Sequence, residues 1–137
     1  MIAAFIALAV ASSAYPSPPR SQVEDAIRAF KSECLSDEGI AVGVRNWTER
    51  MSFVDNHRQT TLAIEAELSA AKKTVPFDVD RYVKALKAAN DDQYLRLSKS
   101  NEYEIKFLRD LPATDRARWA KRLARGYTPP ANYCVRK

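Results

Sequence analysis

Few residues of this chain are of the types that carry out chemistry. There is one histidine, His57, and there are two cysteines, Cys34 and Cys134, among 137 residues. A cysteine nucleophile needs a neighbouring base to form its thiolate, and a serine nucleophile needs a histidine beside it. The sequence contains three glycines and neither a glycine-rich phosphate loop nor a metalloprotease histidine pair. It therefore predicts a binding or interaction protein rather than an enzyme.

Two pairs of carboxylates are the candidate metal ligands. They are Asp78 with Asp80 and Asp91 with Asp92, and carboxylate oxygens are the ligands that hard cations prefer. Neither pair has the spaced acidic residues or central glycine of an EF-hand loop, and helix caps and solvated turns explain both pairs more simply. We take Asp91 and Asp92 as the candidate ligands of Ca²⁺ or Mg²⁺ and expect no other cofactor.

His57 and Thr61 lie one helical turn apart, close to an apolar stripe. Such a polar pair can fix the register of two helices or form the inner wall of a cavity. His57 has no second histidine, free cysteine or acidic residue at zinc-ligand spacing. We therefore interpret it as a hydrogen-bonded or edge-exposed histidine.

The first residues are typical of a secretory signal. Met1 is followed by an apolar run from Ile2 to Ala11, which is too short to span a bilayer but suits the core of a signal peptide. No Lys or Arg precedes the run, and a buried first helix is the alternative. We predict a signal peptide over 1–14, a Pro-rich leader over 15–20 and one helical domain over 21–137, secreted and without a transmembrane segment.

Two extracellular modifications are predicted. Cys34 and Cys134 are expected to pair in an oxidising compartment, closing a loop of about 100 residues that stabilises the fold by at most about 4–5 kcal/mol in the loop-entropy model. A free thiol or an intermolecular bridge is the alternative. Asn46 begins the sequon Asn-Trp-Thr and is a candidate glycosylation site.

The spacing of apolar residues predicts one long helix, from Val44 to Val75, which Pro76 ends. A helix of this length spans about 45 Å, so we expect the other helices to pack along it. Its inward stripe recurs at steps of three, four or seven residues and consists of Trp47, Met51, Val54, Thr61, Ile64, Leu68, Ala71 and Val75.

Shorter helices are predicted before the long one. The first carries Cys34 on its inward face and begins at Ser21, which forms a capping box with Glu24. Ser36 can cap the next helix. Gly39 and Gly43 weaken that helix and predict a kink or mobile turn ahead of the long one.

Further helices are predicted after Pro76. Asp78 caps the first of them, which the polar residues 90–92 interrupt weakly and residues 98–101 end. The next covers 103–111, and the last runs over 115–125 with Thr114 as its cap. The predicted fold is all-α, a bundle of five or six helices around one long central helix, closed by one disulfide.

The net charge of +5 is concentrated near the C-terminus. From Ser21 to Ile105 there are 12 basic and 15 acidic residues, whereas from Lys106 onward there are 9 basic and 2 acidic. The basic helix around Trp119 can contact an anionic surface such as lipid headgroups, although a buried Trp on a solvated helix is the simpler interpretation. A nucleic-acid partner is not expected for a secreted chain.

One set of spaced residues near the start of the domain consists of Leu35, Ser36, Ile40, Val44, Trp47, Glu49, Arg50 and Phe53. It resembles the Leu-Thr…Ile…Leu…Trp-Ala segment of the SXP/RAL-type secreted antigens of nematodes, the family of the Ani s cation-binding helical domain. Leu97 to Pro112 is similar to the second Leu-Thr…Leu-Pro stretch of that family. The chain departs from the pattern by its cysteine pair, by Ser36 where Thr is usual and by its basic last helix.

The resemblance implies a small secreted helical protein with divalent-cation binding and without catalytic residues. The leading hypothesis is such an antigen. The alternative is an extracellular carrier of a lipid or other small apolar ligand, enclosed beside Ile64, Leu68 and Val75, although the same residues would equally form a filled core. A further alternative is a secreted receptor ligand or effector, for which an exposed Trp119 would be the sign.

Overall fold

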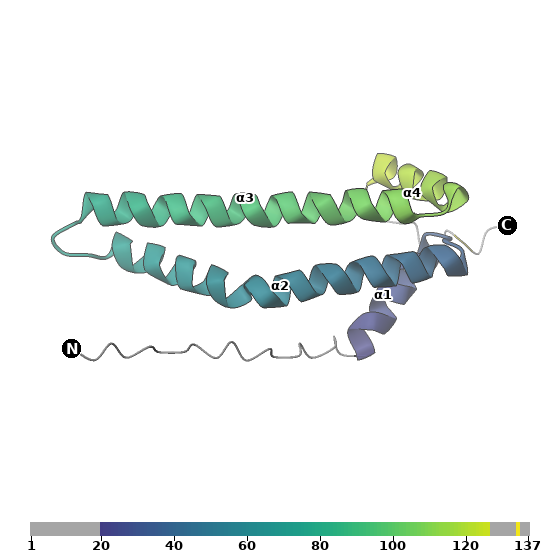
Figure 1. The fold of residues 1–137 in the computed structure, drawn as a ribbon, viewed down its shortest axis with the longest axis horizontal. Coiled ribbons are helices and arrows are strands. Elements are labelled where there is room, and N and C mark those ends of the chain that lie inside the picture. The colour runs from purple at the N-terminus through teal and green to yellow at the C-terminus, as the bar shows by residue number, and fades with distance from the viewer. Residues whose placement is uncertain (1–19, 127–133, 135–137) are drawn as a thin grey trace, which may run out of the picture.

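The computed structural model of the chain describes residues 20–126 and 134, and within them it is all-helical, as the sequence predicted. Figure 1 shows that the long helices run antiparallel and are joined by a turn, with the short helices at the end opposite this turn. The predicted signal peptide and residues 15–19 of the leader lie outside the described residues. The four helices are α1 (Arg20–Ser32), α2 (Asp37–Lys72), α3 (Val79–Asp110) and α4 (Ala113–Arg125).

The described residues form four helices where five or six were expected, and two long helices where one central helix was expected. α2 has 36 residues and α3 has 32. The polar stretches that were predicted to interrupt α3 are continuous helix, because their charges pair along it: Lys87 with Asp91, and Lys99 with Glu102. Pairs at these spacings stabilise a helix surface.

The predicted break at Gly39 and Gly43 is also absent, since both lie inside α2. A Cβ atom at Gly43 would be 2.8 Å from the ring of Phe30 on α1, and one at Gly39 would be 2.8 Å from Cγ of Asp115 on α4. The two glycines therefore allow two neighbouring elements to approach the backbone of α2. Close packing, not flexibility, explains their presence.

The apolar core lies at the end of the molecule opposite the α2–α3 turn, where all four helices meet. We call this the closed end. The ring of Trp119 meets Phe107 edge-on at 4.9 Å between centroids, and Phe30 lies 5.9 Å from Trp119. Towards the turn, the described residues of α2 and α3 bury little more than Ala71, Ala85 and Asp92. The core residues are Leu35, Val42, Phe107, Leu111 and Trp119, with Phe30, Ile40 and Leu108 packed against them.

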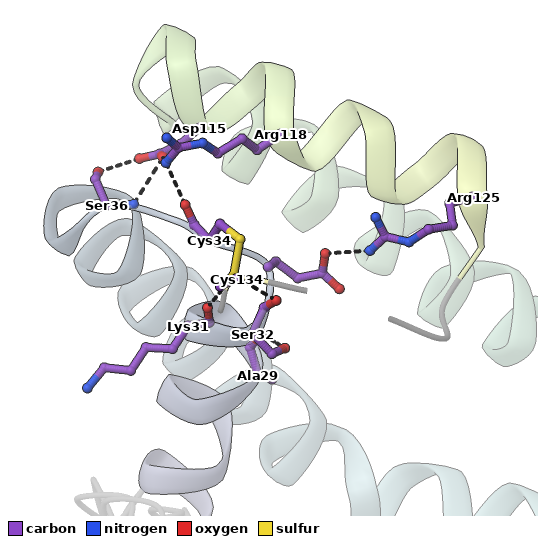
Figure 2. Close-up of a disulfide and its surroundings, with 10 residues drawn as sticks. Ala29, Lys31, Ser32, Cys34, Ser36, Asp115, Arg118, Arg125 and Cys134 are labelled. Atoms are coloured by element: carbon purple, nitrogen blue, oxygen red, sulfur yellow. Dashed lines mark hydrogen bonds and ion pairs between the residues drawn. A yellow bond between two sulfur atoms is a disulfide. The ribbon is translucent and has the colours of Figure 1, made fainter. Parts of the chain in front are cut away.

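A polar junction fastens α4 to the α1–α2 loop (Figure 2). The buried carboxylate of Asp115 accepts hydrogen bonds from the backbone N–H of Ser36, at 3.0 Å, and from its hydroxyl. Ser36 is the N-cap of α2, as predicted, and its hydroxyl accepts the N–H of Gly39. α4 itself begins two residues earlier than expected and has no side-chain cap, so Thr114 does not have its predicted role.

The predicted disulfide is confirmed. Cys34 and Cys134 are bonded, with their Cα atoms 5.3 Å apart. The apolar spacing predicted that Cys34 lies within the first helix. Cys34 instead follows the end of α1, with a φ of 63°. Its carbonyl accepts a hydrogen bond from Arg118 of α4, so the disulfide and the polar junction restrain the same loop. In the part of the chain that is described, no helix combines the length and the apolar character needed to cross a membrane.

Gly43→Ala is expected to lower the free energy of unfolding by about 1–3 kcal/mol, because overpacking against Phe30 outweighs the gain in helix propensity of up to about 1 kcal/mol. Urea denaturation followed by circular dichroism measures the change. Ala63→Gly, on the exposed side of α2, is the control for propensity alone. If Gly43→Ala stabilises the chain by as much as Ala63→Gly destabilises it, α1 does not pack closely on α2.

Candidate ligand-binding groove

A groove runs along one face of the α2–α3 hairpin, next to the closed end. Its volume is about 370 Å³. The α2 residues recur at helical spacing and therefore share one side of the helix. The groove is lined by Arg50, Phe53, Val54, His57, Arg58, Thr61 and Leu62 from α2 and by Arg96, Ser100 and Tyr103 from α3.

A second hollow of about 370 Å³ adjoins the first and lies among the four helices. The two share Arg50, Ser100 and Tyr103. The second extends past Trp47 to Leu123 at the closed end. Their α2 residues run from 46 to 62, which is about 24 Å of helix. Together they make an elongated groove rather than a compact cavity.

A buried carboxylate lies beneath the first hollow. Asp92 of α3 accepts hydrogen bonds from Nε2 of His57 and from the hydroxyl of Thr61, at 3.2 Å, and both donors are on α2. Nε of Arg96, one turn further along α3, donates at 2.9 Å. The ring of Phe53 stacks on His57 at 5.5 Å between centroids. These contacts fix the register of the two long helices and the positions of three groove side chains.

Asp92 remains ionised at neutral pH despite its burial. Burial alone would raise the pKa of Asp92, but the hydrogen bonds from His57, Arg96 and Thr61 and the charge of Arg96 outweigh it. The net result is a pKa below the ordinary value. The negative charge of Asp92 is therefore matched by its own donors and is not presented to the groove.

Two further cations line the groove. Arg50 and Arg58 are exposed, and within residues 20–126 neither has an ion-pair partner. Beside them, Val54 and Leu62 are 45% and 51% exposed. The first hollow thus combines apolar walls with positive charges, an arrangement suited to a ligand that is apolar along its length and negative at one point.

The two predicted cation ligands, Asp91 and Asp92, have different surroundings and different partners. Asp91 is exposed and bonds to Lys87, whereas Asp92 points to α2 and bonds to His57. Asp78 is the N-cap of α3, as expected, and accepts the N–H of Arg81. The described residues include no group of three or more His, Cys, Asp and Glu positioned to hold a metal ion. Cation binding at Asp91 and Asp92 stays a prediction.

Asn46, the predicted glycosylation site, is one of the residues that line the second hollow. Its side chain is buried, and Nδ2 donates a hydrogen bond of 2.9 Å to the carbonyl of Tyr103 on α3. A glycan would be attached to this same nitrogen. Glycosylation of Asn46 stays a prediction, and it would replace a contact between α2 and α3.

The basic last helix directs its arginines into the molecule. Arg122 and Arg125 lie 3.2 and 2.8 Å from the buried carboxylate of Glu33, which follows α1. The guanidinium of Arg122 also lies 4.2 Å from the ring centre of Trp119, and that ring is buried. These charges therefore attach α4 to the rest of the fold. Binding of an anionic surface by this helix stays a prediction.

The contact between His57 and Asp92 was missed in the sequence. The two residues are almost equally distant from the turn at 73–78, which is the signal expected for partners across an antiparallel helical hairpin. Asp92 also lies seven residues after the buried Ala85 and so on the same side of α3. Interpreting residues 90–92 as an interruption concealed this relation.

Comparison of the chain with known protein families, with curated proteins and with solved structures found no match. The resemblance to the SXP/RAL antigens therefore depends on the sequence motifs alone. Function has to be argued from the groove.

Asp92→Asn is expected to lower the free energy of unfolding at pH 7 by about 2–4 kcal/mol, because the buried donors then face a neutral amide. Because the folded-state pKa of Asp92 is lowered, the carboxylate contributes fully above its unfolded pKa of about 3.9 and loses that contribution as the pH falls through its folded value. The wild type should thus lose stability below about pH 5 more steeply than the variant.

Chemical denaturation across pH 2–7 measures both effects. Asp91→Asn is the matched control, because Asp91 is exposed and its pair with Lys87 lies on the surface; it should change stability by less than about 0.5 kcal/mol. An identical acid dependence for the wild type and Asp92→Asn would contradict the assignment.

Proposed function

We propose that this chain is a non-catalytic binding protein that takes an elongated amphiphilic anion, an apolar chain with an acidic head group, in the groove between α2 and α3. The supporting observation is the pair Arg50 and Arg58, cations without an ion-pair partner among the described residues, beside exposed apolar side chains. This is a form of the carrier hypothesis.

The apolar part of the ligand follows from the size and walls of the groove. Small-molecule sites commonly have volumes of about 300–1,000 Å³, apolar linings and a few polar groups, and they form between helices of bundles. The first hollow has these properties. Ile64 and Leu68, where the sequence suggested a cavity, do not line it. The groove lies earlier along α2, at Arg50 to Leu62.

The anionic part follows from the charges. The negative charge of Asp92 is compensated by Arg96, and Asp92 also bonds to His57. It therefore does not compensate the positive charges of Arg50 and Arg58 in the first hollow. Guanidinium groups pair with carboxylates and phosphates through two parallel hydrogen bonds. An acidic head group near Arg50 and Arg58 would direct its chain over Phe53 and Leu62.

An extracellular site of action agrees with the disulfide. A structural disulfide is typical of secreted proteins, and Cys34–Cys134 supports the secretion predicted from residues 1–14. The antigen hypothesis with weak Ca²⁺ or Mg²⁺ binding has the sequence resemblance in its favour. The receptor-ligand alternative called for an exposed Trp119, which is buried.

Arg50→Gln/Arg58→Gln should weaken binding of decanoate by roughly 5- to 30-fold, because two charge-assisted contacts are lost. Binding of decanol, which has the same chain without the charge, should change less than about twofold, since its apolar contacts are unaltered. Isothermal titration calorimetry with both ligands measures the difference at pH 7.

Arg28→Gln/Arg45→Gln is the matched control, because it removes two charges from exposed positions outside the groove. It should leave both affinities unchanged. Equal losses for the two double variants would show that net charge, and not the groove, attracts decanoate. Absence of binding of both ligands to the wild type would reject the proposal.

A further inference from the structure

α3 carries a second apolar stripe that does not face α2. The residues that α3 buries are Ala85, Asp92 and Phe107, and the stripe follows the other side of the helix. Its members are between 37% and 74% exposed, which is unusual for so many large apolar side chains on one helix. They are Val79, Val83, Leu86, Tyr94, Leu97 and Ile105.

The stripe repeats every 11 residues. Val83, Tyr94 and Ile105 are separated by 11, as are Leu86 and Leu97. Eleven residues make three turns of 3.67 residues, close to the 3.6 of a straight helix, so such a stripe drifts little around it. From residue 79 to 105 the stripe is about 40 Å long. This is the pattern of a helix that pairs along its length with another.

We propose that this stripe binds the same stripe of a second copy of the chain, with the two α3 helices antiparallel. When the two antiparallel copies are aligned with Tyr94 at the centre, the apolar residues of one stripe lie opposite residues of the other stripe. Val83 then meets Ile105 of the second copy, and Tyr94 meets its own counterpart. To within one residue of this register, Asn90 of each copy lies level with Leu97 of the other, and Leu86 lies level with Asn101, which gives four mixed layers.

The charges beside the stripe are self-complementary in this orientation. By helical spacing, Asp80, Lys87, Glu102 and Arg109 lie along one edge of the stripe. In an antiparallel pair, this edge of one copy lies beside the same edge of the second copy. To within one residue of the same centre, Lys87 lies across from Glu102 of the second copy, and Asp80 lies across from Arg109. Lys87 and Glu102 also bond to Asp91 and Lys99 of their own helix. A parallel pair would instead set this edge against the opposite one, where Gln93, Ser100 and Glu104 lie and Glu104 is the charged residue.

The proposed dimer surface is separate from the ligand groove. Of α3, the first hollow uses Arg96, Ser100 and Tyr103, and no stripe residue lines it. The interaction therefore goes beyond the proposed function and does not depend on it. Because four layers of the symmetric pair contain Asn and one helix per copy makes the contact, we expect a dissociation constant on the order of 1–100 μM, as for small interfaces.

Sedimentation equilibrium between 1 and 500 μM tests the association. The wild type should convert from monomer to dimer over this range, and Val83→Glu should remain monomeric, since it places a carboxylate on the stripe against Ile105 of the second copy. Val75→Glu is the matched control: Val75 is 93% exposed but lies in the turn, outside the helix, so this variant should dimerise normally. A wild type that is monomeric at 500 μM, or equal loss in both variants, would overturn the proposal.

Orientation is tested by cross-linking and charge exchange. A mixture of Val83→Cys and Ile105→Cys proteins should form a mixed disulfide faster than either protein forms one with itself; faster self-linking of Val83→Cys would reject the antiparallel arrangement. Lys87→Glu should weaken the dimer roughly threefold or more at low salt, and adding Glu102→Lys should restore it. Failure of this restoration would contradict the proposed register.

Discussion

The carboxylate of Asp115 is the contact on which the closed end of the molecule depends. It lies in the first turn of α4 and also receives the N–H and hydroxyl of Ser36, the residue that caps α2. Its negative charge is thus near the positive ends of two helix dipoles, where such a charge is stabilising. Arg118 contributes a compensating positive charge at 3.3 Å. A carboxylate with these neighbours can be buried without a large penalty, and Gly39 leaves the space for it.

The difference in helix length explains why the two ends of the molecule are unlike. α1 and α4 have 13 residues each and cover only one end of a hairpin whose helices have 36 and 32. Where all four helices meet, Trp119, Phe107 and Phe30 form a packed core. Beyond that point, in the part of the chain that the structure describes, the long helices pack on each other alone, and a pair of helices leaves most of its surface in water. The groove and the outer stripe of α3 both follow from this geometry.

The sequence was informative about local signals and poor at relations between distant segments. The caps Ser36 and Asp78 were predicted correctly, and so was the end of α4 at Arg125, because each depends on neighbouring backbone groups. Gly39 and Gly43 were misread as breaks, since propensity does not show that Phe30 and Asp115 occupy the space. His57 and Thr61 were recognised as a polar pair, but their partner is on α3. The role of Arg50 and Arg58 could not be predicted, because only the fold shows which cations have no carboxylate within ion-pair distance among the described residues.

The buried cluster around Asp92 connects the fold to the groove. A hairpin of two long helices is prone to slide by one turn, because its apolar side chains repeat and contribute similarly in either register. Asp92 opposes this, since a shift of one turn, about 5.4 Å, would separate its carboxylate from His57 and Thr61 and leave a charge without partners. The cost of an unpaired buried charge exceeds that of a few displaced apolar contacts. The same register places Arg50 and Arg58 of α2 on the side where Arg96 and Tyr103 of α3 complete the groove, so the contact that aligns the hairpin also shapes its binding surface.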